Sequence, residues 1–598
     1  MIEKMTKYSF ILMSEGSQDF ISRIQDLGVV DITRSSVPVD EETTALLSRM
    51  EFLGKCIKDA SETDFDGSGV EICGTDYAEQ FAEAGEKLSQ IEESLADARR
   101  EREDRLAWGA FDKEAITRLE AAGCHIRYYK VAAKRFNPQW EQDYALARIA
   151  EDGKNIWFVT ADATGNGYDF PLTECPAPEA PYTVSDEMIA TLEEEAREYR
   201  AKLGALKAFV PQMEEARRIT AARLDACLAE AGKSESSEGL LTIFEGYAPS
   251  SDDGRLRSEF DSMDVLWISG AAVTDDNPPI SFRNNRFVRM FEVLTDMYGR
   301  PAYDGFDPTP YISVFFLLFF AMCMGDAGYG LILIAGGFLL KKVKSFASFA
   351  PLVSVLGVAT VVVGFFFHTF FSVDISTWKC IPDAVKSIFV PAKIAGYDGT
   401  MVVSLIVGII HLCLAMTVKT VYATRNKGFL ASLSTWGWTL LIVGGVIVGV
   451  IALLGVIDMA VTKWIIIALG IVSAIGIFFL NDLHRNPLLN IGAGLWETYN
   501  TATGLLGDVL SYLRLYALGL AGSMLGFAFN DMGRMALGDG GSIGGWAAFL
   551  LIVIIGHTLN LAMAALGAFV HPLRLNFLEF FKNSGYEGTG RIYKPMTK

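Results

Sequence analysis

The sequence predicts two regions of different fold class. The first is an α+β region, in which two small α/β lobes are joined by a long antiparallel coiled coil. The second is an all-α membrane region of about eight transmembrane helices, the last two long and tilted. The 598 residues carry a net charge of −19, but residues 308–598 hold 18 Lys and Arg against 12 Asp and Glu. An acidic half therefore precedes an apolar one, which argues against nucleic-acid binding and favours basic protein partners.

The first lobe is expected over 1–40 and 236–300. Its segments with strand composition are YSFILM (8–13), VVDIT (29–33), LLTIFEGYAP (240–249) and DVLWISGAAV (264–273). They are rich in β-branched and aromatic residues, and the stretch 17–28 has helical character. Two separated chain segments are therefore predicted to build one lobe.

Two charge-rich arms, 41–115 and 185–233, are expected to pair as the coiled coil. In the second arm the apolar positions alternate in steps of three and four, at Ile189, Leu192, Ala196, Tyr199, Leu203, Leu206, Val210 and Met213. That spacing is typical of a narrow helix seam. Ser185 is predicted to cap the arm, and Pro211 to kink or break it. The alternative is an ordinary α+β domain with one long hairpin.

A distal lobe is predicted between the arms, over 116–184. HIRYYKVA, ALARIA and IWFVTA have strand composition, and Asp152-Gly153 between the last two is a hairpin signal. We therefore expect a small sheet that follows one arm and precedes the other.

Metal, disulfide and cofactor sites are not expected. The eight cysteines include no C-x-x-C pair, which favours free thiols in a reducing compartment. Gly232-Lys233-Ser234 resembles the end of a phosphate-binding loop, but Cys227 stands where that loop needs glycine, so Gly232 is interpreted as a helix cap. The first residues lack an apolar signal core, so this half is expected in the cytoplasm.

Eight apolar segments are predicted to cross the membrane. They lie near 311–325, 327–340, 347–371, 399–421, 433–457, 463–480, 498–532 and 545–581. The first two are short, so we expect tilted or incomplete crossings. Basic residues follow the second, fourth and sixth segments, at Lys341, Lys342, Lys344, Arg425, Lys427, His484 and Arg485. By the positive-inside tendency, these loops and both termini are cytoplasmic, although Lys379, Lys386 and Lys393 weaken the asymmetry.

The seventh segment carries an arginine within apolar sequence. Arg514 stands in GDVLSYLRLYALGLAG, and the next formal charge is Asp531. An arginine at the centre of a span costs roughly 2.5–3.5 kcal/mol on insertion scales, so a chain retains it for a counter-charge, a cavity or an ion path. Small residues on the same face let another helix approach. They are Gly507, Ser511, Ala517 and Ala521.

The eighth segment carries a polar stripe. Asn560, His571 and Arg574 share one helix face, which predicts an aqueous path, with Arg574 nearer the cytoplasm. Segments seven and eight each run for roughly 50 Å of helix against an apolar core of about 30 Å, so they must tilt or project.

Five further polar residues have less specific assignments. Glu497 lies near the cytoplasmic end of the seventh segment, and Asp508 is a counter-ion, a helix contact or a proton group on another face. His411 and His557 are expected to be packed and hydrogen-bonded. Asp326 is expected to satisfy the loop between the first two apolar segments.

Four motifs resemble the membrane subunit of rotary V-type and archaeal-type ATPases, called subunit a or I. They are DPTPYISVFFLLFFAMCMGDAGYG (307–330), LIVGIIH (405–411), SYLRLYALGLA (511–521) and HPLRL (571–575). The resemblance covers nearly the whole chain. It implies a stator subunit that hydrolyses nothing itself and provides two half-channels for H⁺ or Na⁺ beside a rotating proteolipid ring. It further implies an integral protein of a prokaryotic plasma membrane.

The resemblance also implies roles and partners. Arg514 would face the ring, with Arg574 beside it. The N-terminal region would bind peripheral-stalk coiled coils, while the central stalk and the ATP-hydrolysing head are indirect partners. Eukaryotic members have a glutamate in the eighth segment where this chain has Ala564, so the far-side half-channel is expected to use Asn560 or His557.

Two other classes of protein compete with this hypothesis. A secondary transporter would need related repeats and discontinuous helices around a midplane site, and the short first segments have no counterpart in the second half. A membrane-anchored scaffold explains the N-terminal half but not two intramembrane arginines.

Overall fold

The computed structural model describes residues 1–35, 40–162, 170–178, 180–236, 240–343, 346–347, 349–378, 381–394, 396–480, 487–538 and 543–598. The predicted positions Lys344, Lys379, His484 and Arg485 lie outside the described residues. The chain divides into two compact units. We name them the membrane unit (Met1–Leu12, Val29–Ile32 and Ile243–Pro595) and the arm unit (Met13–Gly28, Thr33–Thr242 and Met596–Lys598).

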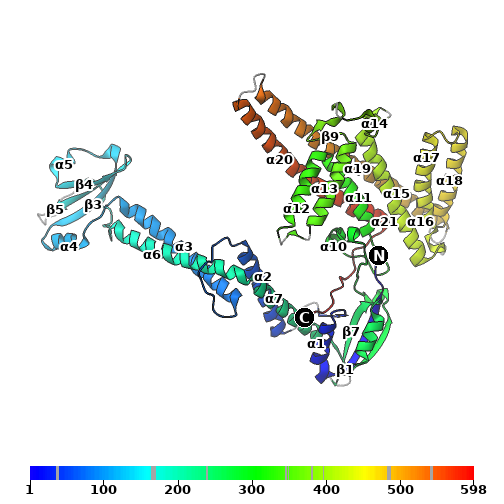
Figure 1. The fold of residues 1–598 in the computed structure, drawn as a ribbon, viewed down its shortest axis with the longest axis horizontal. Helices are drawn as coiled ribbons and strands as arrows, with labels where there is room; N and C mark the ends of the chain where they lie inside the picture. The colour runs from blue at the N-terminus through cyan, green and yellow to red at the C-terminus, as the bar shows by residue number, and fades with distance from the viewer. Residues whose placement is uncertain are drawn as a thin grey trace. The chain divides into compact units, whose positions relative to one another are not determined.

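Long helices that pack in pairs dominate the arm unit (Figure 1). The long helices are α2 (Glu41–Glu62), α3 (Tyr77–Leu106), α6 (Tyr182–Leu206) and α7 (Val210–Ala231), and the shorter ones include α1 (Ser17–Leu27) and α4 (Lys113–Ala121). The helix α3 packs against α6, and α2 packs against α7. Ion pairs from Arg99 to Glu193 and from Arg200 to Glu92 show that α3 and α6 run antiparallel.

Apolar seam residues fill the space between the paired helices. Leu203, Leu206 and Met213 are buried in one cluster with residues of α2 and α3. Pro211 lies in the first turn of α7, where its missing N–H leaves no helical bond unmade. A 3₁₀ turn, Lys207–Phe209, separates α6 from α7, so the predicted break is confirmed.

The predicted cap at Ser185 is wrong. The helix α6 already begins at Tyr182, after Pro181, whose fixed φ suits a helix start. Ser185 is instead buried inside the helix and accepts a hydrogen bond from Arg105 Nη1 at 3.1 Å. The hydroxyl therefore bridges two helices and caps neither.

A three-stranded sheet forms the distal lobe. Its strands β3 (His125–Ala132), β4 (Leu146–Glu151) and β5 (Asn155–Asp162) are antiparallel, in the order β3-β5-β4. Gly153 has a φ of +77° in the hairpin turn, as the Asp152-Gly153 signal predicts. The carboxyl of Asp152 accepts the N–H groups of Lys154 and Asn155, which closes the turn.

A second sheet belongs mainly to the membrane unit. Four of its five strands, β1 (Met5–Met13), β2 (Asp31–Ile32), β7 (Leu241–Pro249) and β8 (Leu266–Ala271), follow the order β2-β7-β1-β8. The strand β1 pairs antiparallel with β8, from Thr6 opposite Ala271 to Ile11 opposite Leu266. All four strands coincide with segments of predicted strand composition.

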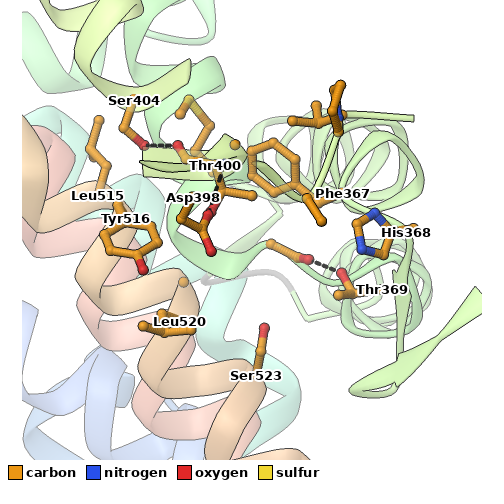
Figure 2. Close-up of a pocket in the computed structure, with 17 residues that line it drawn as sticks. Phe367, His368, Thr369, Asp398, Thr400, Ser404, Leu515, Tyr516, Leu520 and Ser523 are labelled. Atoms are coloured by element: carbon orange, nitrogen blue, oxygen red, sulfur yellow. Dashed lines mark hydrogen bonds between the residues drawn. The ribbon is translucent and has the colours of Figure 1, made fainter. Parts of the chain in front are cut away.

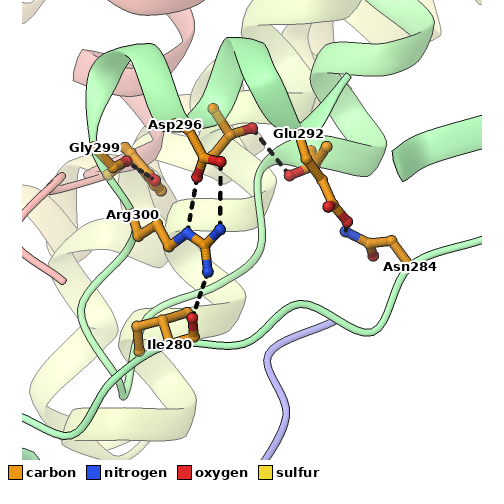
Figure 3. A network of polar contacts seen from close by, with 9 residues as sticks. Ile280, Asn284, Glu292, Asp296, Gly299 and Arg300 are labelled. Carbon is orange, nitrogen blue, oxygen red and sulfur yellow. Dashed lines mark hydrogen bonds and ion pairs between the residues drawn. The ribbon is translucent and has the colours of Figure 1, made fainter. Parts of the chain in front are cut away.

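Polar contacts hold together the segment between this sheet and the first membrane helix (Figure 3). The Arg300 guanidinium pairs with Asp296 at 2.8 Å and donates to the Ile280 carbonyl at 2.5 Å. Asn284 donates to Glu292 at 3.1 Å, and burial raises the pKa of that carboxyl. These contacts fix the segment that leads into the membrane helices.

The C-terminal tail joins the same region, which the sequence did not predict. Ile592 forms a bridge with Ile280, and Gly590 with Arg300. The Tyr593 hydroxyl donates to the Val29 carbonyl, and burial raises the pKa of that phenol.

Apolar helices make up most of the membrane unit (Figure 1). They are α11 (Thr309–Met324), α12 (Ala327–Leu340), α13 (Ala350–Phe366), α15 (Gly399–Lys427), α16 (Leu433–Thr439), α17 (Gly445–Leu453), α18 (Met459–Phe479), α19 (Pro487–Leu537) and α20 (Ile543–Arg574). Among the described residues, five helices are long and apolar enough to cross a membrane, while α11, α12 and α13 are shorter. Eight crossings and cytoplasmic termini stay predictions.

Candidate functional site

Arg514 lies at a junction of three membrane helices. It is in the middle of α19, which contacts α11, α15 and α20. Its charge acts on Cys323 of α11, on His571 of α20 and on Glu579. The side chain is half-buried, and its Nη1 atom is buried without a hydrogen-bond partner. No described residue accepts a hydrogen bond from this Nη1 atom, so an acceptor from another molecule can bind it.

The face of α19 that holds Arg514 is largely uncovered by the described residues. Gly507, Ala517 and Ala521 are exposed, and Ser511 is half-buried with its hydroxyl bonded to the Gly507 carbonyl at 3.1 Å. A Cβ atom at Gly507 would meet nothing within 4 Å. Large apolar side chains are also exposed along α19, at Leu506, Leu510, Met524 and Phe527. An apolar strip with one charge at its centre is an unpartnered helix-packing surface.

Asp508 and Glu579 form an acidic pair beside this junction. The Asp508 carboxyl accepts from Asn583 Nδ2 at 2.8 Å and pairs with Lys582 Nζ at 3.5 Å. Of the roles open to Asp508, the structure shows a helix contact through Asn583 and a counter-charge in Lys582, while a proton role stays a prediction. Glu579 is only 4% exposed, lies beside Ser511, and has an Oε2 atom without a partner.

Glu579 is not among the site residues predicted from the sequence. Its negative charge within the predicted apolar segment 545–581 could have identified it. A π-helix, Leu575–Phe580, follows α20 and contains this glutamate, and Pro572 precedes it inside α20. A proline removes one helical N–H, and π-helical turns often occur at functional sites.

Arg574 and His571 lie near the same junction but differ in exposure. Arg574 is exposed in the last turn of α20, and His571 is half-buried with its Nδ1 atom unpartnered. Asn560 is buried and about 21 Å away along the helix from Arg574, at 1.5 Å per residue. The two ends of the predicted polar stripe thus differ in exposure, and its role as an aqueous path stays a prediction.

Asn560 belongs to a buried hydrogen-bond network with Tyr329. Its Nδ2 atom donates to the Tyr329 hydroxyl and to the Gly522 carbonyl, both at 2.8 Å. The Tyr329 hydroxyl also contacts His557 Nδ1 at 2.7 Å, and His557 Nε2 contacts Asn530 at 3.0 Å. The sequence identified the histidine and one asparagine, but Tyr329 and Asn530 are joined to them only by long-range packing.

Asp326 holds the turn between α11 and α12, as expected. Its buried carboxyl accepts the N–H groups of Gly328 at 2.8 Å, Phe371 at 2.8 Å and Ser372 at 2.5 Å. These bonds cap α12 and fix the segment after α13. The carboxylate therefore has a structural use for both oxygens.

His411 is also packed and hydrogen-bonded, as expected. It is fully buried on α15, contacts the Tyr512 hydroxyl at 2.9 Å, and stacks on Phe580 with ring centroids 4.8 Å apart. Glu497, in contrast, is half-buried and makes no hydrogen bond or ion pair with any described residue. It lies about 25 Å before Arg514 along α19 at 1.5 Å per residue.

A cavity of about 210 Å³ lies beside the face of α19 that is formed by Leu515, Tyr516 and Ser523, away from the face that holds Arg514 (Figure 2). Leu515 and Tyr516, directly after Arg514, line it together with Ser523. Polar residues on its opposite wall are His368, Thr369, Asp398, Thr400 and Ser404. Within the described ranges, no group of three His, Cys, Asp or Glu side chains is arranged to hold a metal ion.

Long apolar helices with a partly unpaired arginine at their centre, attached to an α/β region, define a membrane protein that handles charge within the bilayer. A sequence model of the V-type ATPase 116kDa subunit family matches residues 233–381. The chain is similar to this family over that segment, and over more of its length to proteins named subunit I of the V-type and A-type ATP synthases.

Three relatives illustrate the match. The A-type ATP synthase subunit I of Methanocaldococcus jannaschii is 29% identical over 59% of this chain and 54% of its own length. That of Pyrococcus horikoshii is 32% identical over 54% and 48%. The chain thus spans about half the length of these archaeal relatives. The V-type ATP synthase subunit I 1 of Treponema pallidum is 26% identical over 100% of both chains.

Proposed function

We propose that this chain is the stator membrane subunit of a rotary V/A-type ATPase. It provides two half-channels for H⁺ or Na⁺ to and from a rotating proteolipid ring, and its arm unit anchors the peripheral stalks. The observation that carries the proposal is Arg514, with an unused buried donor, in the middle of an uncovered small-residue and apolar face.

The chemistry of arginine explains why one residue can organise this function. A ring carboxylate cannot cross lipid ionised without severe cost, so it travels neutralised by its ion. When it reaches the uncovered face of α19, the fixed charge of Arg514 favours the ionised carboxylate, and the ion is released to one side. Because a guanidinium stays protonated, it also repels cations that would leak between the two sides.

Polar groups lie on both sides of Arg514 along α19, which supports two separate paths. Asp508 is six residues earlier, about 9 Å along the helix, and lies on the cytoplasmic side if both termini are cytoplasmic. Gly522 and Asn530 lie about 12 and 24 Å beyond Arg514 and contact the network of Asn560 and His557.

Asn560 is well placed to line the half-channel that opens on the non-cytoplasmic side of the membrane. It lies one helical turn before Ala564, which replaces the glutamate of eukaryotic relatives, so both residues share a face of α20. We therefore assign Asn560 and His557 to the far-side half-channel.

The arm unit supplies the part that meets helical partners. Its paired helices expose many charged side chains, including both members of the Arg99–Glu193 pair. We propose that the lobes bind coiled-coil stalk subunits, and that the central stalk and the ATP-hydrolysing head are reached indirectly. In this arrangement the chain hydrolyses no ATP itself.

Purification from native membranes tests the proposal most directly. A tagged full-length chain should bring down a proteolipid of ring size and helical stalk subunits, with ATP-hydrolysing subunits. A tagged chain that purifies without a proteolipid contradicts the stator function, and so does near-normal ion pumping by a complex that carries Arg514→Gln.

A further inference from the structure

Glu579 is a buried carboxyl group that lies beside the Ser511 hydroxyl and keeps one oxygen without a partner. Only 4% of the residue is exposed, and its Oε2 atom has no hydrogen-bond partner. Its neighbour Asp508, by contrast, is committed to Lys582 and Asn583. An unpaired buried oxygen is costly unless a transient partner completes it.

The surroundings of Glu579 connect water with Arg514. The Lys582 side chain is 61% exposed, and its partner Asp508 is 13% exposed. Because an ammonium group is costly to place in lipid, an exposed Lys582 favours an aqueous edge at this end of the helices. Glu579 lies farther inside, beside Ser511, and interacts electrostatically with both Asp508 and Arg514. The exposed fraction thus falls stepwise from Lys582 through Asp508 to Glu579.

The other groups near Glu579 cannot exchange a proton as readily. Among the described residues, those that face it or its π-helix are Asp508, Tyr512 and Arg514 on α19, His411 on α15, Tyr311 on α11, Tyr298 ahead of α11, and Lys582. Arginine and lysine stay protonated and tyrosine stays neutral near pH 7. His411 is fully buried, with Nδ1 against Tyr512 and Nε2 without a partner, so it has no exposed neighbour such as Lys582. Asp508 is ion-paired with Lys582, so Glu579 is the carboxyl of this group that has no ion pair with a described residue.

We propose that Glu579 is the proton relay of the path on the Asp508 side of Arg514. This inference rests on the proposed stator function and commits the path to protons. During pumping, a proton from water forms an O–H bond with the Glu579 carboxylate. That bond breaks as the proton passes to the ionised ring carboxylate leaving Arg514, and the reverse order operates in synthesis. No electrons are exchanged, and the negative charge moves from the ring to Glu579.

The test uses the intact complex, purified through a tagged chain and reconstituted into vesicles that report internal acidification. Glu579→Gln keeps the size of the side chain but removes the titrating oxygen, so ATP-driven acidification should fall by about 100-fold, the usual scale for a lost proton-transfer group. Glu587→Gln is the matched control, because it makes the same change at an exposed position eight residues later and should pump normally. Glu579→Asp should pump with a displaced pH profile.

Each alternative outcome decides the proposal. Pumping by Glu579→Gln within about twofold of the parent overturns the relay, given the size of a lost proton-transfer step. If that variant fails to assemble, Glu579→Asp decides, because an unchanged pH profile or a second assembly failure assigns Glu579 to the fold. Sodium uptake that persists with a protonophore overturns the proton step. If Arg514→Gln abolishes pumping while Glu579→Gln does not, only the relay fails. Absence of a proteolipid from the parent complex instead refutes the stator function.

Discussion

Charged residues in the arm unit and in the membrane unit obey different rules. On α3 and α6, Arg99 and Glu193 form an ion pair at 2.7 Å, and their side chains are 59% and 46% exposed. Such a pair contributes about 0–1 kcal/mol, because water screens it. On α19, Arg514 has no ion pair with any described residue and one buried unpartnered donor. The comparison teaches that a paired charge in water is replaceable, while an unpaired charge in the membrane indicates function.

The largest effect is expected at Arg514. Arg514→Gln and even Arg514→Lys should lower ATP-driven pumping by at least about 100-fold in reconstituted vesicles while the complex still assembles. Lysine keeps a charge but loses the planar fork and part of the reach. Near-normal pumping by either variant would remove the contrast between the two regions.

In the arm unit, the largest effect should come from an apolar residue. Leu206 is fully buried between the paired helices, so Leu206→Ala should lower the local opening free energy by about 2–5 kcal/mol. Amide hydrogen exchange in α3 and α6 should accelerate accordingly. Leu119→Ala serves as the control, because Leu119 is exposed on α4 and should change little. Equal responses from both variants would show that the seam does not hold the arms together.

Substitution of Arg574 tests whether a charged residue of the membrane helices matters less for pumping when it is exposed. Because it is exposed near the end of α20, Arg574→Ala should reduce pumping by less than about tenfold, or ~1.4 kcal/mol in barrier height. Transport rates measured across pH would check this. Complete loss would place Arg574 beside Arg514 as obligatory, whereas no change at any pH would leave it with a structural role.

The smallest effect is expected at Arg99. Arg99→Ala should alter the opening free energy of α3 by less than about 1 kcal/mol, and the difference should shrink further in high salt. Hydrogen exchange at two salt concentrations would measure it. A larger, salt-independent loss would mean that Arg99 acts through packing of its alkyl stem.

Local sequence patterns predicted helices, strands and turns better than they predicted contacts between residues far apart in the chain. The step of three and four in the second arm identified residues that are buried, and the Asp152-Gly153 turn was found because it depends on neighbours in sequence. The Ser185 cap failed because a contact with Arg105, 80 residues away, decides the use of its hydroxyl. Composition cannot reveal such a partner.

The same limit applies to the candidate site. Arg514, Asn560 and His557 were found because polar residues are conspicuous in apolar sequence. Tyr329 was missed, since only its contacts with α20 show that it completes a network. Glu579 was equally conspicuous as a charge in an apolar segment, but its burial became apparent only from the packing of its π-helix. The roles of all these residues in ion transport stay proposals.

The C-terminal tail has a mechanical consequence. The sheet of the membrane unit is connected to the membrane helices at residue 307 and again through the tail, where Tyr593 and Ile592 bond to Val29 and Ile280. If one chain segment alone connected the sheet to the helices, the sheet could rotate about that segment. With two separate connections, a sideways force stretches one connecting segment and compresses the other. A load applied to α20 therefore reaches the sheet through the tail as well as through α11, so the two parts twist together.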